Sequence, residues 1–307
     1  MDIASISMTV LTVLLGAIGV TFVGIFLGLA YKGIDRKIAA HMQGRIGPPL
    51  RQPFLDVRKL LVKESIVPEN AISWLFNLVP VLGLGATITI LLYLPIGGLP
   101  SILDGFVSAK GDLLVILYLL ILPSLAMVIG GFSSGSPYAT VGAQREMTTM
   151  IAYEFPLAII IISLAWRLSL VEGAGNVFAI STVLSTPIWA VVGPVGFIGA
   201  IILLLALVIV TPAELSKIPF DSPEAETEIA DGLMVEYSGR NLGMFYLMDG
   251  VKMVVMGSLI IALFFPYNLS PLLGLNSYAG LAVDILFYLA KLFLVLLFSV
   301  TLIRVAV

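Results

Sequence analysis

The chain has 307 residues, of which 59% are hydrophobic and 11% are charged, and its formal net charge is −3. A soluble domain carries about 25% charged residues, so this composition excludes a soluble enzyme, a nucleic-acid-binding protein and a disordered chain, and indicates a polytopic membrane protein. The sequence has no Cys and a single His, His41. This excludes disulfides, Fe–S ligation by Cys and thiol nucleophiles, and it argues against a His-based metal site.

Seven segments are long and apolar enough to cross a bilayer core, which needs about 20 apolar residues per helix. The runs are too long for strands and do not alternate, so we predict an all-α polytopic membrane protein with about seven transmembrane helices, forming a single membrane domain over residues 1–307. The first run is too long for a cleavable signal peptide, and no basic region precedes it. The predicted spans are 7–31, 72–94, 112–131, 148–167, 189–211, 242–265 and 281–304.

The basic residues predict the orientation. Twelve of the 16 Lys and Arg residues fall in the segments 32–71, 132–147 and 212–241 and at the C-terminal end, whereas two fall on the opposite side and two inside spans. Basic residues concentrate on the cytoplasmic side of a membrane protein. We therefore expect a multi-pass protein of the cell membrane with these three segments as cytoplasmic loops, the N-terminus outside and the C-terminus in the cytoplasm.

The first cytoplasmic loop contains a turn followed by an amphipathic helix. Gly47 and the two prolines after it stop any helix. From Pro53 to Glu64 the apolar residues recur at helical spacing and charged residues fill the other positions, which is typical of a helix lying at the membrane surface. Two interpretations stay open for this helix, a simple lipid anchor and a docking element for a partner.

The third cytoplasmic loop is acidic, against the positive-inside trend. Glu224 and Glu228 are four residues apart and are expected to share a helical face, and crowded acids raise one another's pKa, which suits proton transfer. A solvated acidic loop is the alternative, although the flanking Pro, Phe, Tyr and Gly residues favour packing. The acids are Glu214, Asp221, Glu224, Glu226, Glu228, Asp231 and Glu236.

Four charged residues lie within predicted spans, namely Glu154, Asp249, Lys252 and Lys291. A charge in lipid costs several kcal/mol unless it is paired or hydrated, so such residues indicate an internal hydrated path. Asp249 and Lys252 are three residues apart and are expected to pair with each other. The alternative is that paired charges merely fix helix packing.

Together, four motifs in order give the chain a specific resemblance. They are Arg45 to Pro48 followed by Gln52, Asp56, Lys59 and Lys63-Glu64; Gly142-Ala143 with Arg145 and then Tyr153-Glu154; Glu214 through Pro219-Phe220-Asp221 to Glu226; and Glu236 to Gly239 followed by Asp249. With them the chain resembles the complex I subunit 1 family, which comprises membrane subunits of respiratory complex I and of its hydrogenase relatives.

This resemblance implies a membrane subunit that joins a cytoplasmic redox arm to ion-pumping membrane subunits. We assign a proton path or coupling role to Glu154, Glu214, Asp221, Glu224, Glu226, Glu228, Glu236, Asp249, Lys252 and Lys291. We assign arm docking to Arg36, Arg45, Pro48, Gln52, Asp56, Lys59, Lys63, Glu64, Arg145 and Tyr237. Catalytic and metal-ligating residues are not expected in this chain.

Departures from the quinone-reducing pattern indicate a branch of the family. Pro49 stands where those members usually have Asn, and Thr149, Ala152 and Leu215-Ser216-Lys217 also differ. The Pro-Pro form resembles the membrane-anchor subunit of group 4 membrane-bound hydrogenases and of related ferredoxin-oxidising, sulfane sulfur reductase-type complexes. The family commonly has one more helix after the position of Arg304, so we expect seven spans against its eight.

The resemblance implies the partners and cofactors. The partners would be Fe–S and catalytic subunits of the arm, antiporter-like and small membrane subunits, and the bilayer, with no nucleic acid. The chain itself would bind no redox cofactor, since Fe–S clusters, and in hydrogenases Ni–Fe, would belong to partners. Two alternatives stay open, the quinone-site subunit of a proton-pumping NADH or F420H2-type dehydrogenase, and a stand-alone ion transporter.

Overall fold

The computed structural model describes residues 3–96, 112–171, 175–274 and 278–306, which consist of helices joined by loops, with an isolated bridge between Asp112 and Ala179. Seven helices in these ranges are long and apolar enough to span a membrane, which confirms the predicted fold class. The helices are α1 (Ile3–Met42), α2 (Gln52–Val62), α3 (Ser73–Tyr93), α4 (Leu113–Ser133), α5 (Pro137–Ser169), α6 (Ile180–Ser185), α7 (Ile188–Val191), α8 (Pro194–Glu214), α9 (Glu226–Ile229), α10 (Gly239–Phe264), α11 (Tyr278–Leu296) and α12 (Leu302–Ala306). Short 3₁₀ turns η2 (Ser222–Glu224) and η3 (Gly232–Met234) flank α9, and the π-helical turn η4 (Leu297–Thr301) joins α11 to α12.

Two helices extend well beyond the apolar runs that predicted them. α1 continues to Met42, 11 residues past the predicted end at residue 31, and α5 begins at Pro137, 11 residues before the predicted start at residue 148. A helix satisfies its own backbone hydrogen bonds and so needs no apolar side chains to continue into water. Gly44 follows the end of α1 in a left-handed conformation with φ of 70°, and Pro137 starts α5 at a position where its missing N–H is harmless.

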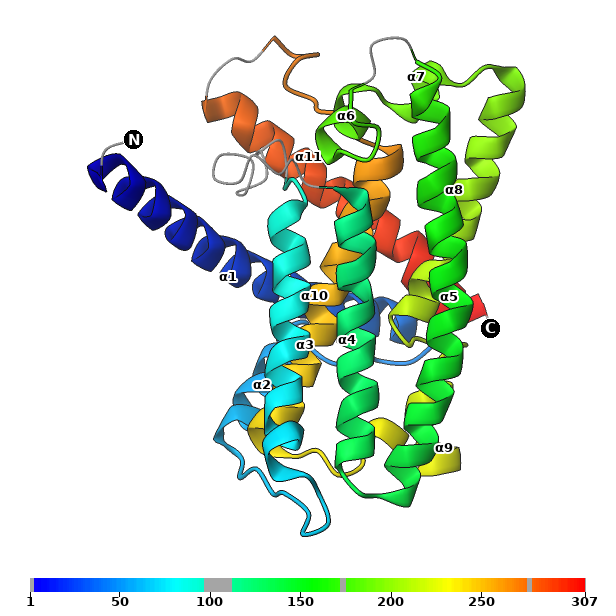
Figure 1. Cartoon of the computed structure of the whole chain (residues 1–307). Helices are drawn as coiled ribbons and strands as arrows, with labels where there is room; N and C mark the ends of the chain where they lie inside the picture. The colour runs from blue at the N-terminus through cyan, green and yellow to red at the C-terminus, as the bar shows by residue number, and fades with distance from the viewer. Residues whose placement is uncertain (1–2, 97–111, 172–174, 275–277, 307) are drawn as a thin grey trace.

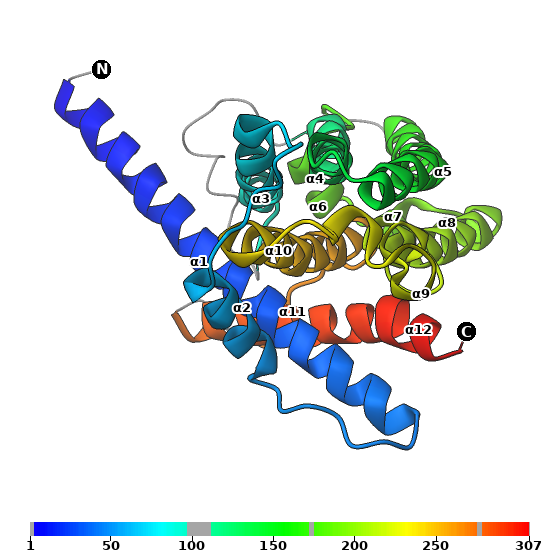
Figure 2. The same ribbon diagram turned by 90° about the horizontal axis from the view of Figure 1, so that it is seen from below.

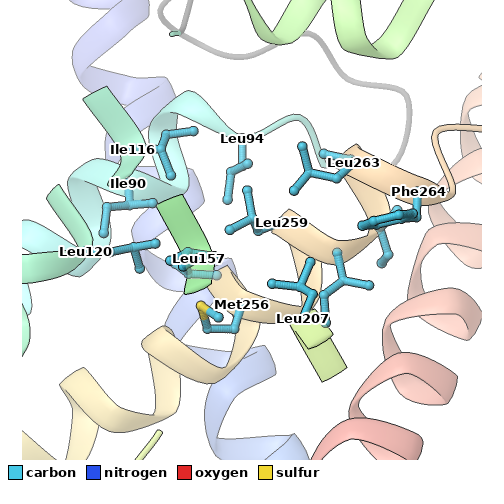
Figure 3. Packing of buried hydrophobic residues seen from close by; sticks show 14 of the residues in the cluster. Ile90, Leu94, Ile116, Leu120, Leu157, Leu207, Met256, Leu259, Leu263 and Phe264 are labelled. Carbon is cyan, nitrogen blue, oxygen red and sulfur yellow. The ribbon is translucent and has the colours of Figure 1, made fainter. Parts of the chain in front are cut away.

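Helix α10 lies at the centre of the fold (Figure 1). Seen from below, α3, α4, α5 and α8 form an arc on one side of it, and α1 and α11 lie on the other (Figure 2). Every residue of α10 from Gly250 to Phe264 is buried. Its apolar side chains pack against those of the surrounding helices (Figure 3), where Leu157 of α5, Leu207 of α8 and Leu259 of α10 are at most 2% exposed.

The first helix meets α10 at a very close crossing and then leans away from the bundle (Figure 1). A Cβ atom built on Gly28 would lie 2.4 Å from the carbonyl carbon and oxygen of Gly250, a distance that real side chains do not tolerate. Glycine at position 28 therefore lets the two backbones touch. This contact fixes the separation of α1 and α10 at the level of the charged residues that follow on both helices.

The predicted amphipathic helix is present as α2. Pro53 and Val57 are buried while Arg58 and Lys59 are exposed, as the apolar spacing indicates. The helix ends at Val62, two residues before the predicted end, because Lys63 adopts an extended conformation. α2 packs against α1 and α10 near the end of the molecule that carries the acidic segment 214–238 (Figure 2).

Candidate functional site

A polar cavity of about 670 Å³ lies where the C-terminal part of α1, the middle of α10 and the segment after α8 meet. Its wall mixes charges with apolar side chains such as Met127, Phe245 and Met248. The charged lining residues are Lys32, Asp35, Arg36, Glu214, Lys217, Asp221, Glu224, Glu226, Glu228, Asp249, Lys252 and Arg304. Several predicted coupling residues are thus brought together in one place.

Asp249 is the centre of one charge cluster. Its Oδ2 atom lies 2.7 Å from the Lys32 ammonium and 3.0 Å from that of Lys217. Lys32 also donates to the backbone carbonyl of Tyr246 at 2.8 Å and lies over the ring of that residue. One carboxylate therefore joins α1, α10 and the segment after α8. Burial disfavours the charge of Lys217, but the attraction of Asp249 outweighs it and raises the lysine pKa.

The prediction that Asp249 pairs with Lys252 is wrong. Lys252 instead forms an ion pair with Glu214 of α8, with its Nζ 2.9 Å from Oε1, and both side chains are almost fully buried. Residues three apart on a helix point about 60° apart, and because α10 is enclosed by other helices, that difference directs the two side chains to different neighbours. The second oxygen of Glu214, Oε2, is buried with no hydrogen-bond partner among the described residues.

A line of hydroxyl groups extends from this ion pair. Lys252 Nζ donates to Ser124 Oγ of α4 at 2.9 Å, and Ser124 Oγ lies 2.7 Å from Tyr153 Oη of α5. Tyr153 donates to Oε1 of Glu146 at 3.3 Å. Glu146 is 1% exposed and is not among the residues predicted for the site.

The acidic segment closes one side of the cavity. Burial in the cavity wall raises the pKa of Glu224 to about 7, although the nearby Lys217 ammonium opposes the rise. Glu228 points to Arg145 of α5, whose guanidinium is 2.6 Å from its carboxylate and also donates to the carbonyl of Ser222. Glu224 and Glu228 do not share a helical face as predicted, because the extended Ala225 separates η2 from α9.

The remaining predicted coupling residues are divided between the cavity and other places. Asp221 and Glu226 line the cavity. Glu154 and Glu236 are half-buried but do not line it. Lys291 donates to the carbonyls of Phe265 and Tyr267 after the far end of α10, so it joins a separate region.

The predicted docking residues fall into an exposed group and a packed group. Arg45, Lys59, Lys63 and Glu64 are exposed, and Pro48 is half-buried. In the packed group, Arg36 pairs with Asp56 at 3.2 Å and Gln52 donates to the same carboxylate at 2.8 Å. Tyr237 stacks on Phe76 in a buried cluster, with ring centroids 4.1 Å apart, which suits a packing role within this chain.

Five site residues were not predicted from the sequence, namely Lys32, Asp35, Glu146, Lys217 and Arg304. Asp35 is buried and binds Arg304 and Thr301 at 2.8 Å each, which ties the C-terminal turn to α1. Lys32, Lys217 and Arg304 look in the sequence like basic loop residues that only set the orientation. Within the described ranges, no group of three or more His, Cys, Asp and Glu side chains could hold a metal ion.

Comparison with known proteins gives consistent matches. The profile of the NADH dehydrogenase family matches residues 15–307. The H-type subunit 1 of the NADH-quinone oxidoreductase of Koribacter versatilis is 34% identical over 86% of this chain and 62% of its own length, so the chain spans less than two thirds of that relative. Hydrogenase-4 component C of Escherichia coli is 34% identical over 78% of this chain and 71% of its own. A chain of the membrane-bound sulfane sulfur reductase, an archaeal respiratory membrane complex, superposes with a TM-score of 0.73 at 29% identity, covering 94% of this chain and 88% of that one.

Proposed function

The chain belongs to the NADH dehydrogenase family that includes complex I subunit 1 of NADH-quinone oxidoreductases, and from this premise we propose that it is the membrane coupling subunit of a ferredoxin-driven, ion-translocating oxidoreductase. It is a multi-pass membrane protein with seven candidate spans. In the proposed complex it anchors a cytoplasmic Fe–S and catalytic arm and transmits protons or conformational change to antiporter-like subunits. The chain itself holds no redox cofactor, and its N-terminus lies outside the cell.

The observation that carries the proposal is the position of the polar cavity. Its wall includes the acidic segment 214–228, which two of the four motifs define or flank, and it continues inward to the buried Lys252–Glu214 pair. A partner bound to the exposed loops would therefore contact groups that are directly connected to charges inside the membrane. The exposed Arg45, Lys59 and Lys63 offer a basic docking surface beside it.

Coupling requires that the charged groups interact differently with two states of the arm. In our proposal, a redox change in the arm alters the charge or the conformation next to segment 214–228. Glu224, whose pKa lies near neutral pH, then gains or loses a proton. The Lys217–Asp249–Lys32 cluster and the Lys252–Glu214 pair respond to that change because they share the same cavity.

Two similarities support the ferredoxin-driven branch. The structural match is to a sulfane sulfur reductase and one of the similar relatives is a hydrogenase-4 component. The alternative is a quinone-site subunit, which the relatives named as NADH-quinone oxidoreductases suggest. The cavity favours the first interpretation, because twelve charged residues in its wall suit water and protons better than an apolar quinone ring.

The first experiment is purification of the native complex in mild detergent, followed by identification of its chains, metals and extractable quinone. Fe–S partners with nickel would support a hydrogenase, and Fe–S partners without nickel or quinone would support a sulfur-reducing relative. Co-purified quinone would instead favour the quinone-site function. A chain that is stable and transports ions without partners would refute the coupling role and establish a stand-alone transporter.

The second experiment tests coupling directly. In complexes reconstituted into liposomes, Glu214→Gln is expected to keep assembly and electron transfer but to lose most of the ion movement per electron. Glu69→Gln is the matched control, since Glu69 is an exposed acid outside the cavity. Full ion movement per electron in the Glu214 variant would contradict the proposal.

A further inference from the structure

The line of hydrogen bonds that leaves the cavity ends at a buried acid. Lys252, Ser124, Tyr153 and Glu146 are each at most 3% exposed, and the three successive donor–acceptor distances are 2.9, 2.7 and 3.3 Å. The four side chains come from α10, α4 and α5, so the line crosses from the central helix to the outer arc. Such a continuous path through a helix bundle needs side chains placed on three separate helices.

The direction of each hydrogen bond in this line is determined by chemistry. A lysine ammonium can only donate, so Ser124 Oγ accepts from Lys252. An ionised carboxylate can only accept, so Tyr153 donates to Glu146. The Ser124 hydroxyl hydrogen must then point to Tyr153 Oη. Every donor therefore points away from Lys252 and toward Glu146, which is the arrangement that a stepwise proton transfer requires.

We propose that Lys252, Ser124 and Tyr153 form a proton wire whose terminal acceptor is Glu146. The Lys252 ammonium gives a proton to Ser124 Oγ while Ser124 passes its own proton to Tyr153 Oη and Tyr153 passes its own to Glu146 Oε1. Lys252 becomes a neutral amine, Glu146 a neutral acid, and both hydroxyl groups are restored. Lys252 then regains a proton from water in the cavity through Glu214, whose free oxygen Oε2 is available to accept it.

This inference rests on the proposed function, because a proton wire is useful only where protons are moved. Its alternative is a static network that holds α4, α5 and α10 together. The structure contains a matched static example. Ser258 and Tyr288 form a second buried hydroxyl pair, 2.6 Å apart, and Ser258 also bonds the carbonyl of Val254. That pair has no bonded acid or lysine side chain among the described residues.

The experiment compares the two hydroxyl pairs in the native complex. Infrared spectroscopy after a rapid pH change follows protonation of the carboxyl group whose band is lost in Glu146→Gln. Tyr153→Phe removes the hydroxyl but keeps the ring, and it is expected to slow this protonation by about 10²-fold, the lower end of the contribution of a positioned proton-transfer group. Tyr288→Phe removes an equivalent hydroxyl and should leave the rate within twofold.

Three outcomes would decide the matter. An unchanged rate in Tyr153→Phe, or equal slowing in both Tyr variants, would overturn the wire and leave a structural network. If Tyr153→Phe fails to assemble, Ser124→Ala should slow the protonation and Ser124→Thr, which keeps a hydroxyl, should restore it; loss without rescue would also overturn the wire. The pH change needs no redox turnover, so a wild-type complex with a working wire but no redox-linked ion movement would refute the proposed function alone.

Discussion

Replacing Lys252 with Met tests how the buried charges hold the bundle together. The change removes the ammonium but keeps an unbranched side chain of similar length. Glu214 would remain buried, with its side chain 1% exposed and its ammonium partner gone. Removing one partner of a buried ion pair costs about 3–5 kcal/mol, whereas removing both charges is often close to neutral. We therefore expect a large loss of stability in Lys252→Met and recovery of most of it in the double variant Lys252→Met/Glu214→Gln.

The assay is thermal stability of the detergent-solubilised complex, followed by size-exclusion chromatography after heating. A loss of about 3–5 kcal/mol in a protein of this size corresponds to a fall of roughly 5–15 °C in Tm. Lys63→Met is the control because Lys63 is exposed and surface charges contribute about 0–1 kcal/mol. A single variant as stable as the control, or a double variant worse than the single one, would refute the assignment of this pair as a mutually dependent unit.

Three further predictions follow from particular contacts. Gly28→Ala should destabilise the complex by about 1–3 kcal/mol through overpacking against the Gly250 carbonyl, whereas Gly250→Ala, whose added Cβ would lie 3.5 Å from Gly28, should cost clearly less in the same thermal assay. Glu224 has a folded-state pKa of about 7, above the ordinary value of 4.5, so the stability it contributes is fully present below pH 4.5 and is lost as pH rises through 7; Glu224→Gln should flatten the pH dependence of Tm across this window, and an unchanged slope would disprove the shift. Arg145→Ala should raise the hydrogen-exchange rate of residues 222–229, which Arg145 holds through Glu228 and Ser222, while Arg145→Lys should raise it less.

The spans could be predicted from the sequence because lipid imposes a simple requirement of length and apolarity. The same requirement misled at the ends of α1 and α5, since a helix that leaves the bilayer has no reason to stop there. The amphipathic helix α2 was predictable because its period of apolar residues reports one buried face.

Much of the candidate site followed from the grouping of acids near the motifs, but the pairings did not. Whether Asp249 meets Lys252 or Lys217 depends on how the helices around α10 are rotated, and no local pattern carries that information. Lys32 and Arg304 have the same appearance in the sequence as residues that only set orientation. Glu146 lies beside Arg145 in a stretch that looks solvent-exposed, and its burial arises from the packing of α4 and of segment 223–233 against α5.

The central position of α10 has a consequence for the birth of the protein. Helices enter the membrane in chain order, so α1, α3, α4, α5 and α8 arrive before the helix around which they pack. Until then Lys32 and Glu214 lack their partners Asp249 and Lys252, and two uncompensated charges must be tolerated by a half-made bundle. Insertion of α10 supplies both counter-charges in one step. A nascent chain halted before residue 239 should therefore be a good substrate for membrane quality-control proteases, and one released after residue 264 a poor one.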